Sequence, residues 1–173
     1  MVETNDRRLP VGIQSFEEIR KNGYLYVDKT DIIWQLVNRG KTYNYLIRPR
    51  RFGKSVLVDT LESYFLGKKE LFEGLKIMQM ETEWVKRPVI RLDMSRAGAE
   101  PETLRSYLDI TFDRLEEEYG ITPKPTARLA DRFNAIIVGA YEQTGQQVAI
   151  LIDEYDSPLQ HSWKTPQHEA CTA

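Results

Sequence analysis

The feature that most constrains the fold is an apolar run, residues 148–152, that ends directly in two carboxylates, Asp153 and Glu154. The run does not alternate between apolar and polar side chains, which is typical of a strand covered on both faces in a parallel sheet. Residues 88–94 predict a second strand, because β-branched and other apolar side chains dominate them as well. Strands that alternate with helices along a chain indicate an α/β fold with right-handed crossovers.

Four stretches repeat apolar side chains at the spacing of one helix face. Residues 30–39 predict a short amphipathic helix, and a second helix is expected to begin at about Lys54 and to end before Gly67. Between these two helices, residues 42–47 are rich in β-branched and aromatic side chains and predict a strand. The apolar side of the second helix is expected to pack on that strand. The two longer helices are expected over residues 104–119 and 129–141.

Length and composition limit the class of protein. The 173 residues fit a single domain with one core, and 41% of them are hydrophobic and 29% charged, which excludes a disordered chain. The longest stretch without a charged side chain, residues 143–152, is about half the length of a membrane-spanning helix. The N-terminus lacks the pattern of a secretory signal, so we expect a cytoplasmic protein without a membrane partner. One cysteine excludes an internal disulfide framework.

The first motif, residues 48–55, reads Arg-Pro-Arg-Arg-Phe-Gly-Lys-Ser and lies between a predicted strand and a predicted helix. A phosphate-binding loop, G-x-x-x-x-G-K-[ST], requires this setting, because its backbone N–H groups and lysine hold phosphates while its hydroxyl binds Mg²⁺. Gly53 matches the second glycine of that pattern, but Arg48 stands in place of the first. The alternative is a simple turn that Ser55 caps before a helix. The predicted nucleotide contacts are Arg50, Arg51, Phe52, Gly53, Lys54 and Ser55.

The second motif is the strand at 148–152 with its two carboxylates. P-loop ATPases place a magnesium-directed aspartate at the end of such a strand. Asp153 is therefore expected to face the metal held by Ser55, and Glu154 to polarise the water that attacks the γ-phosphate. The predicted catalytic residues are Glu154 and Lys54, the predicted metal ligands are Ser55 and Asp153, and the predicted cofactors are ATP and Mg²⁺. The alternative is an acidic pair that only solvates the end of a strand.

Five segments carry a resemblance to a known family: residues 24–30, 48–55 and 64–75, Trp84 with residues 88–90, and residues 151–158. Together they resemble the AAA-ATPase-like family of prokaryotic P-loop proteins, over roughly residues 9–160. That family has Arg-Pro-Arg-Arg-Phe-Gly-Lys-Ser at its phosphate loop, so Arg48 is a family variant. The resemblance implies ATP binding, with Lys54 and Ser55 on phosphate and magnesium and Asp153 and Glu154 on metal and hydrolysis. Its members commonly continue into a restriction-endonuclease-like nuclease domain, of which this sequence contains nothing.

The resemblance also implies an architecture, the P-loop NTPase three-layer sandwich around a parallel sheet. In this branch of ATPases a further strand lies between the strands at 42–47 and 148–152, yet no apolar strand pattern follows Asp153. The core is therefore expected to be incomplete at its C-terminus and prone to associate through open strand edges. The expected segments are an N-terminal extension with a short helix in residues 1–40, an ATPase core in 41–160 and an aperiodic tail in 161–173.

Two other functions stay open. One is a nucleotide-binding scaffold without turnover. The other is a nucleic-acid-binding module, because Arg48, Arg50, Arg51 and Lys54 place four positive charges within seven residues. The net charge of −2 gives no general bias toward nucleic acid. ATP is the favoured partner of this cluster because the cluster lies on the predicted phosphate loop itself. The other expected partners are further copies of the chain or a C-terminal nuclease-like domain.

Overall fold

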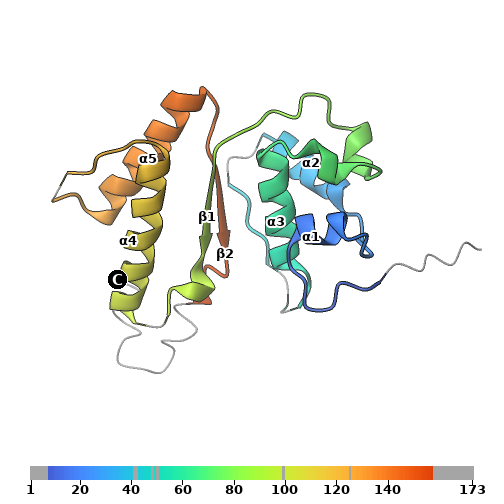
Figure 1. The fold of residues 1–173 in the computed structure, drawn as a ribbon, viewed down its shortest axis with the longest axis horizontal. Helices are drawn as coiled ribbons and strands as arrows, with labels where there is room; N and C mark the ends of the chain where they lie inside the picture. The colour runs from blue at the N-terminus through green and yellow to red at the C-terminus, as the bar shows by residue number, and fades with distance from the viewer. Residues whose placement is uncertain are drawn as a thin grey trace, which may run out of the picture. The chain divides into compact units, whose positions relative to one another are not determined.

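The computed structural model describes residues 8–40, 43–47, 49, 51–98, 100–124 and 126–157. The chain divides into two units, residues 1–86 and 87–173, and each unit has its own hydrophobic core (Figure 1). The first unit contains α1 (Phe16–Lys21), α2 (Thr30–Asn38), α3 (Lys54–Phe65) and the 3-10 turns η1 (Lys69–Phe72) and η2 (Lys76–Gln79). The second unit contains β1 (Val89–Asp93), the 3-10 turn η3 (Met94–Arg96), α4 (Pro101–Glu118), α5 (Leu129–Thr144) and β2 (Ala149–Asp153).

The core of the first unit is aromatic. Phe16 is completely buried, and its ring lies 5.0 Å from the ring of Tyr26 and 4.9 Å from that of Phe72. The apolar side of α3, which includes Leu57 and Leu61, packs against this cluster. The helix therefore has the predicted bounds but a different partner, because aromatic residues from α1 and η1 cover the side that was expected to meet a strand.

Hydrogen bonds from backbone N–H groups to the side chains of Asp28 and Thr30 fix the start of α2. The carboxylate of Asp28 accepts the N–H of Thr30 at 2.9 Å and the N–H of Lys76 at 2.8 Å. The buried hydroxyl of Thr30 in turn accepts the N–H of Ile77 at 3.1 Å. Because each of these donors would otherwise lack a partner, the two side chains hold α2 and η2 together.

The predicted strand at 42–47 is wrong where the structure describes it. Residues 43–47 form no strand, and the side chains of Tyr43, Tyr45 and Ile47 are exposed. A strand requires a neighbouring strand, and the sheet that the structure describes consists of β1 and β2 without this segment. Residues 41 and 42, like Arg48 and Arg50 of the first motif, lie outside the described residues.

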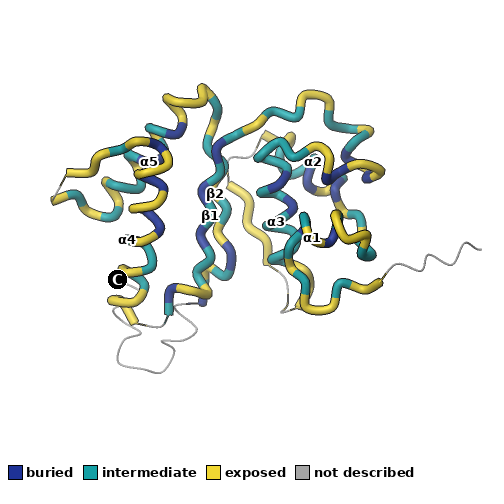
Figure 2. The backbone as a smooth tube through the Cα atoms, viewed as in Figure 1, coloured by how far each residue is buried: buried dark blue, intermediate teal, exposed yellow. Residues whose placement is uncertain are grey.

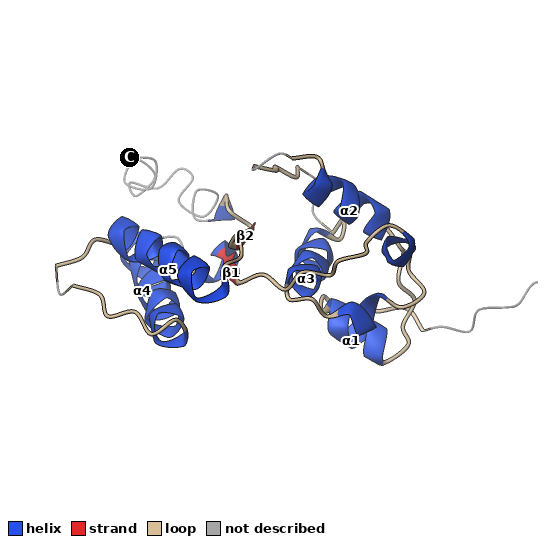
Figure 3. Cartoon of the chain, turned by 90° about the horizontal axis from the view of Figure 1, so that it is seen from above, coloured by secondary structure: helices blue, strands red, loops and turns tan. Residues whose placement is uncertain are grey.

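The second unit confirms the predicted strands at 88–94 and 148–152 and the α/β class. β1 and β2 pair in parallel, in a register that sets Ile90 opposite Ile150 and Asp93 opposite Asp153. On one side of the sheet, α4 and α5 lie side by side (Figure 3), and their Phe112, Leu115 and Ile136 form a core with Ile90 and Leu92. The predicted helices over residues 104–119 and 129–141 are thus confirmed, with α4 beginning three residues earlier at Pro101.

The two strands differ in how far they are covered (Figure 2). Ile90 and Leu92 of β1 are buried, whereas Ile150 and Ile152, opposite them on the same side, are 41% and 49% exposed. The expectation that the 148–152 strand is covered on both faces is therefore wrong for the described residues, because the helix layer covers β1 more than β2. The small parallel sheet agrees with an α/β fold, and the full three-layer sandwich stays a prediction.

The predicted division into segments 1–40, 41–160 and 161–173 also stays a prediction, and the tail lies outside the described residues. Within the described parts of the chain, no helix combines the length and the apolar character that crossing a bilayer requires.

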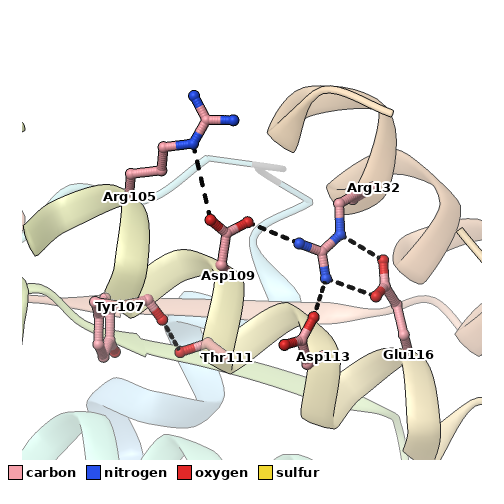
Figure 4. Close-up of polar contacts among 7 residues, drawn as sticks. All are labelled: Arg105, Tyr107, Asp109, Thr111, Asp113, Glu116 and Arg132. Atoms are coloured by element: carbon pink, nitrogen blue, oxygen red, sulfur yellow. Dashed lines mark hydrogen bonds and ion pairs between the residues drawn. The ribbon is translucent and has the colours of Figure 1, made fainter. Parts of the chain in front are cut away.

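A buried arginine joins α4 to α5 (Figure 4). Arg132 donates from Nε and Nη2 to the carboxylate of Glu116 at 2.8 and 2.6 Å, from Nη1 to Asp109 at 2.8 Å and from Nη2 to Asp113 at 2.6 Å. The side chains of Arg132 and Glu116 are only 11% and 5% exposed. The guanidinium group also lies 5.7 Å from the centre of the Phe112 ring, so it contributes both charge and packing to the contact.

Replacement of Arg132 by Met is expected to lower the free energy of unfolding by about 3 kcal/mol, because it leaves the Glu116 carboxylate buried without its cation. Urea unfolding followed by circular dichroism measures this loss. The matched control is Arg128→Met, since Arg128 pairs with Asp131 on the surface and its loss should leave the unfolding midpoint unchanged. Equal shifts in the two variants would contradict a specific role of the buried pair.

Candidate functional site

The N-terminus of α3 is arranged as an anion site. Gly53 is the N-cap residue, no side chain caps the helix, and the first turn contains no acidic residue. Backbone N–H groups in the first turn of a helix have no partner within the helix, and the helix dipole makes this end attractive to a phosphate. Ser55 lies inside the first turn and Gly53 is the N-cap residue, so a cap at Ser55 is wrong, while the choice between a simple turn and a phosphate loop stays a prediction.

The loop before α3 has a left-handed backbone. Gly53 has φ of +72°, and a Cβ atom added there would meet no atom within 4 Å. The glycine is therefore needed for its backbone conformation and not for lack of space. Arg51 also has a positive φ, of 64°, a conformation that costs a residue with a side chain about 1 kcal/mol. Arg51 and Phe52 are both exposed next to the helix end.

The carboxylate pair lies at the C-terminal end of β2. Asp153 is the last residue of the strand and is only 7% exposed, and its Oδ1 accepts the N–H of Glu154 at 3.0 Å. Glu154 has φ of 48°, and its carbonyl accepts the N–H of Ser157 at 2.8 Å. The strand therefore ends in a tight left-handed turn that keeps the first carboxylate buried and the second more accessible.

Backbone strain coincides with both motifs. Among the described residues, three that are not glycine have a positive φ: Arg51, Trp84 and Glu154. Such conformations persist only where the surrounding structure imposes them, and they are concentrated at functional sites. Two of the three lie within the predicted nucleotide motifs, which supports a functional origin of the strain.

The sequence reasoning missed Asp93. This residue ends β1 directly opposite Asp153, its carboxylate accepts the N–H and the hydroxyl of Ser95 at 3.1 and 2.6 Å, and its own N–H donates to the hydroxyl of Tyr107 at 2.9 Å. The available signal was that both predicted strands end in an aspartate. Only the register, which no local pattern contains, sets the two aspartates side by side.

The structure brings together two groups of predicted site residues. Arg51 to Ser55 are contiguous in the first unit, and Asp153 and Glu154 are adjacent in the second. Within the described part of the chain, no group of three or more His, Cys, Asp or Glu side chains is placed to hold a metal ion. Mg²⁺ commonly takes only one or two protein oxygens and completes its shell with phosphate and water, so the hydroxyl of Ser55 and the carboxylate of Asp153 fit it chemically. The joining of the two groups in one site stays a prediction.

Comparison with known proteins agrees with these motifs. A family model described as "Predicted AAA-ATPase" matches residues 10–172. The chain is also similar to an "Uncharacterized protein in vnfD 5'region" of Azotobacter chroococcum mcd 1, with 36% identity over 164 residues. That match covers 93% of this chain but 31% of the relative, so the chain spans about a third of the length of the protein that it matches. No solved structure matches the chain.

The left-handed turn at Glu154 predicts an unusual response to glycine. Glu154→Gly and Glu154→Ala remove the same side chain beyond Cβ, but only glycine relieves the backbone. The glycine variant should therefore be more stable than the alanine variant by about 1 kcal/mol, a difference that thermal or urea unfolding can resolve. If the alanine variant is the more stable one, the turn is not strained.

Proposed function

The chain belongs to the AAA-ATPase-like family of predicted AAA-ATPases, and on that basis we propose that it binds ATP with Mg²⁺ as part of the ATPase core of a larger protein. The observation that carries the proposal is the N-terminus of α3. It is uncapped, it follows a left-handed glycine, and it holds the lysine and the serine of the family motif in its first turn. These are the features that a bound phosphate requires.

Each residue of the loop has a role in binding. The first-turn N–H groups of α3 donate to phosphate oxygens, and Lys54 places its ammonium group against the β- and γ-phosphates. Arg51 and Phe52, exposed beside the helix end, contribute a positive charge and an apolar contact to the nucleotide. The hydroxyl of Ser55 is one ligand of the metal.

The carboxylates have separate roles. Bound Mg²⁺ would neutralise charge on the phosphate oxygens. The buried Asp153 orients toward the metal, and Glu154, which is the more accessible of the two, accepts a proton from the attacking water. Partial burial of Asp153 supports this division, because a carboxylate that is shielded from water binds a cation more strongly than an exposed one.

The sheet is proposed to extend beyond β2 in the larger protein. The support is the half-exposed pair Ile150 and Ile152, which a further strand with its own helix would cover. The work that ATP hydrolysis drives, a nuclease-like partner domain and an oligomeric state belong to that larger protein, which the chain matches over about a third of its length.

MgATP is expected to stabilise the wild-type chain against heat, by about 2.7 kcal/mol at a concentration of one hundred times its dissociation constant. Lys54→Ala should lose most of this shift, because it removes the charge that faces the phosphates. The matched control is Lys69→Ala, which removes an exposed lysine of η1 and should keep the shift. Calorimetry without any nucleotide-dependent shift in the wild type would reject the proposal, and displacement of ATP by nucleic acid would indicate that both use the loop.

Replacing Asp153 and replacing Glu154 by the corresponding amides should impair different functions. Glu154→Gln is expected to keep MgATP affinity and lose phosphate release, because it retains the shape of the side chain without the base. Asp153→Asn should instead weaken the dependence of ATP binding on Mg²⁺ concentration. Titration calorimetry at several Mg²⁺ concentrations, together with a phosphate-release assay, measures both. Equal losses of affinity in the two variants would contradict the separate roles, and wild-type binding without turnover would favour the scaffold alternative.

A further inference from the structure

The segment that leaves the first unit, residues 81–87, is attached to the C-terminal end of α3. The hydroxyl of Tyr64, in the last turn of α3, donates to Oε2 of Glu81, and Oε1 of Glu81 accepts the N–H of Glu83 at 3.0 Å. Partial burial disfavours the charged form of Glu81, but hydrogen bonds from Tyr64 and from the backbone N–H groups of residues 82–84 outweigh this effect and lower its pKa. A single carboxylate thus organises the whole turn.

Trp84 closes the same contact with its ring. The indole lies 5.1 Å from the ring of Phe72 and 5.8 Å from that of Tyr64, measured between ring centres. Two features oppose this position. The backbone of Trp84 is left-handed, with φ of 46°, and its indole N–H is buried without a hydrogen-bond partner. The strained backbone and the unpaired N–H are both unfavourable, and the favourable packing of the indole ring offsets them.

The end of α3 is shaped to receive this segment. The helix ends at Phe65. Gly67, two residues later, has φ of +69°, and the bonds from Gly67 N–H to Tyr64 O and from Lys68 N–H to Ser63 O form a Schellman motif. A Cβ atom at Gly67 would lie 3.4 Å from Cβ of Lys86 and 3.5 Å from the carbonyl oxygen of Trp84. The segment therefore passes in contact with the helix end.

The contacts at Glu81 and Trp84 determine how many residues of unattached chain connect the two units. The carbonyl of Pro88 accepts the N–H of Ala149 at 2.9 Å, so the chain is committed to the sheet from residue 88 onward. Only residues 85–87 lie between that point and Trp84. Loss of the contacts at Glu81 and Trp84 would free residues 81–87, and the span of the connection would rise from about 10 Å to about 24 Å at full extension.

We propose that Glu81 and Trp84 form a releasable clasp on α3, and that a nucleotide at the opposite end of that helix keeps the clasp closed. One 12-residue helix carries both parts, with Lys54 in its first turn and Tyr64 in its last (Figure 1). A phosphate that holds the N-terminus of α3 restrains the last turn, on which the clasp closes. The clasp itself follows from the contacts above, whereas its control by nucleotide rests on the proposed function.

The strain at Trp84 is what makes the clasp releasable. In the closed form the indole buries its ring, but the backbone is strained and the N–H is unpaired. In the open form the backbone relaxes and the N–H bonds to water, while the ring loses its packing. Each form thus has favourable and unfavourable contributions to its free energy that partly cancel. A ligand that binds one form more tightly than the other shifts their populations.

Hydrogen exchange of the full 173-residue chain, read on peptides that cover residues 82–88, tests the clasp without nucleotide. Glu81→Gln should speed exchange about fivefold, because an amide nitrogen would face the Tyr64 hydroxyl or the backbone N–H groups. Tyr64→Phe is a second route to the same opening. The matched control, Glu83→Gln, changes an exposed carboxylate of the same turn and should exchange as the wild type does.

Substitutions of Trp84 distinguish a releasable clasp from an ordinary core contact. Trp84→Phe keeps an aromatic ring on Phe72 and Tyr64 and removes the unpaired N–H, so exchange should stay within about twofold of wild type, whereas Trp84→Ala should open the segment. If phenylalanine opens the segment as far as alanine does, or if Glu81→Gln leaves exchange unchanged, the releasable clasp is wrong.

Saturating MgATP tests the control by nucleotide. It should slow exchange at residues 82–88 in the wild type, and by reciprocity the closed form should bind MgATP more tightly than the open form by the same factor. Glu81→Gln should therefore bind MgATP more weakly than the wild type in proportion to the open population that it adds. Binding of MgATP, detected by calorimetry, with unchanged exchange would overturn the coupling and leave the proposed function intact. Absence of MgATP binding would overturn the proposed function and the coupling together, while the variants without nucleotide would still decide whether the clasp exists.

Discussion

The packing of the apolar side of α3 into the aromatic cluster is the contact on which the first unit depends. Leu57 and Leu61 face Phe16, Phe72 and their neighbours, and the carboxylate of Asp59, on the same helix, accepts the N–H of Phe16 at 2.7 Å. The helix is therefore fixed along its length by contacts that lie away from its two ends. Its first turn is the proposed anion site, and the Tyr64 hydroxyl in its last turn donates to Glu81. A rigid element with one group at each end is one physical route by which two sites are coupled.

The second unit is built on a different principle, the parallel register of β1 and β2. That register sets Asp93 beside Asp153 at the edge where ligands bind in open α/β sheets. Arg132 then holds α4 and α5 together on one side of the sheet through three carboxylates. The ion network lies on the helices, whereas backbone turns hold the strand ends. The side chains that join the helices are therefore different from those of the proposed site.

Local pattern predicted most of the elements because each has its own local signal. The helix from Lys54 ends at Phe65, before Gly67 as expected, and the strands at 88–94 and 148–152 became Val89–Asp93 and Ala149–Asp153. The errors have a common physical cause, which is that strands depend on neighbours. Residues 43–47 have the composition of a strand but are not part of the described sheet. Ile150 and Ile152 have the composition of a buried strand but are half exposed. The two motifs of the candidate site could be located from the sequence. The position of Asp93 beside Asp153 could not, because it depends on the register of the strands. The strained turns could not be predicted either, because composition does not determine their backbone angles.

The three strained residues have one property in common. At Arg51, Trp84 and Glu154 a glycine would adopt the same left-handed backbone at no steric cost, so the side chain is present in spite of the strain. Two of these side chains are charged and lie in the loop and in the strand turn that the family motifs assign to nucleotide, and the third is the indole that closes the connecting segment onto α3. At Trp84 the packing of the ring on Phe72 and Tyr64 stabilises the first unit and offsets the strain, whereas the side chain of Arg51 is exposed and that of Glu154 is partly exposed. At these three positions the chain keeps a side chain at an energetic cost to its backbone, and two of the positions belong to the site proposed for nucleotide.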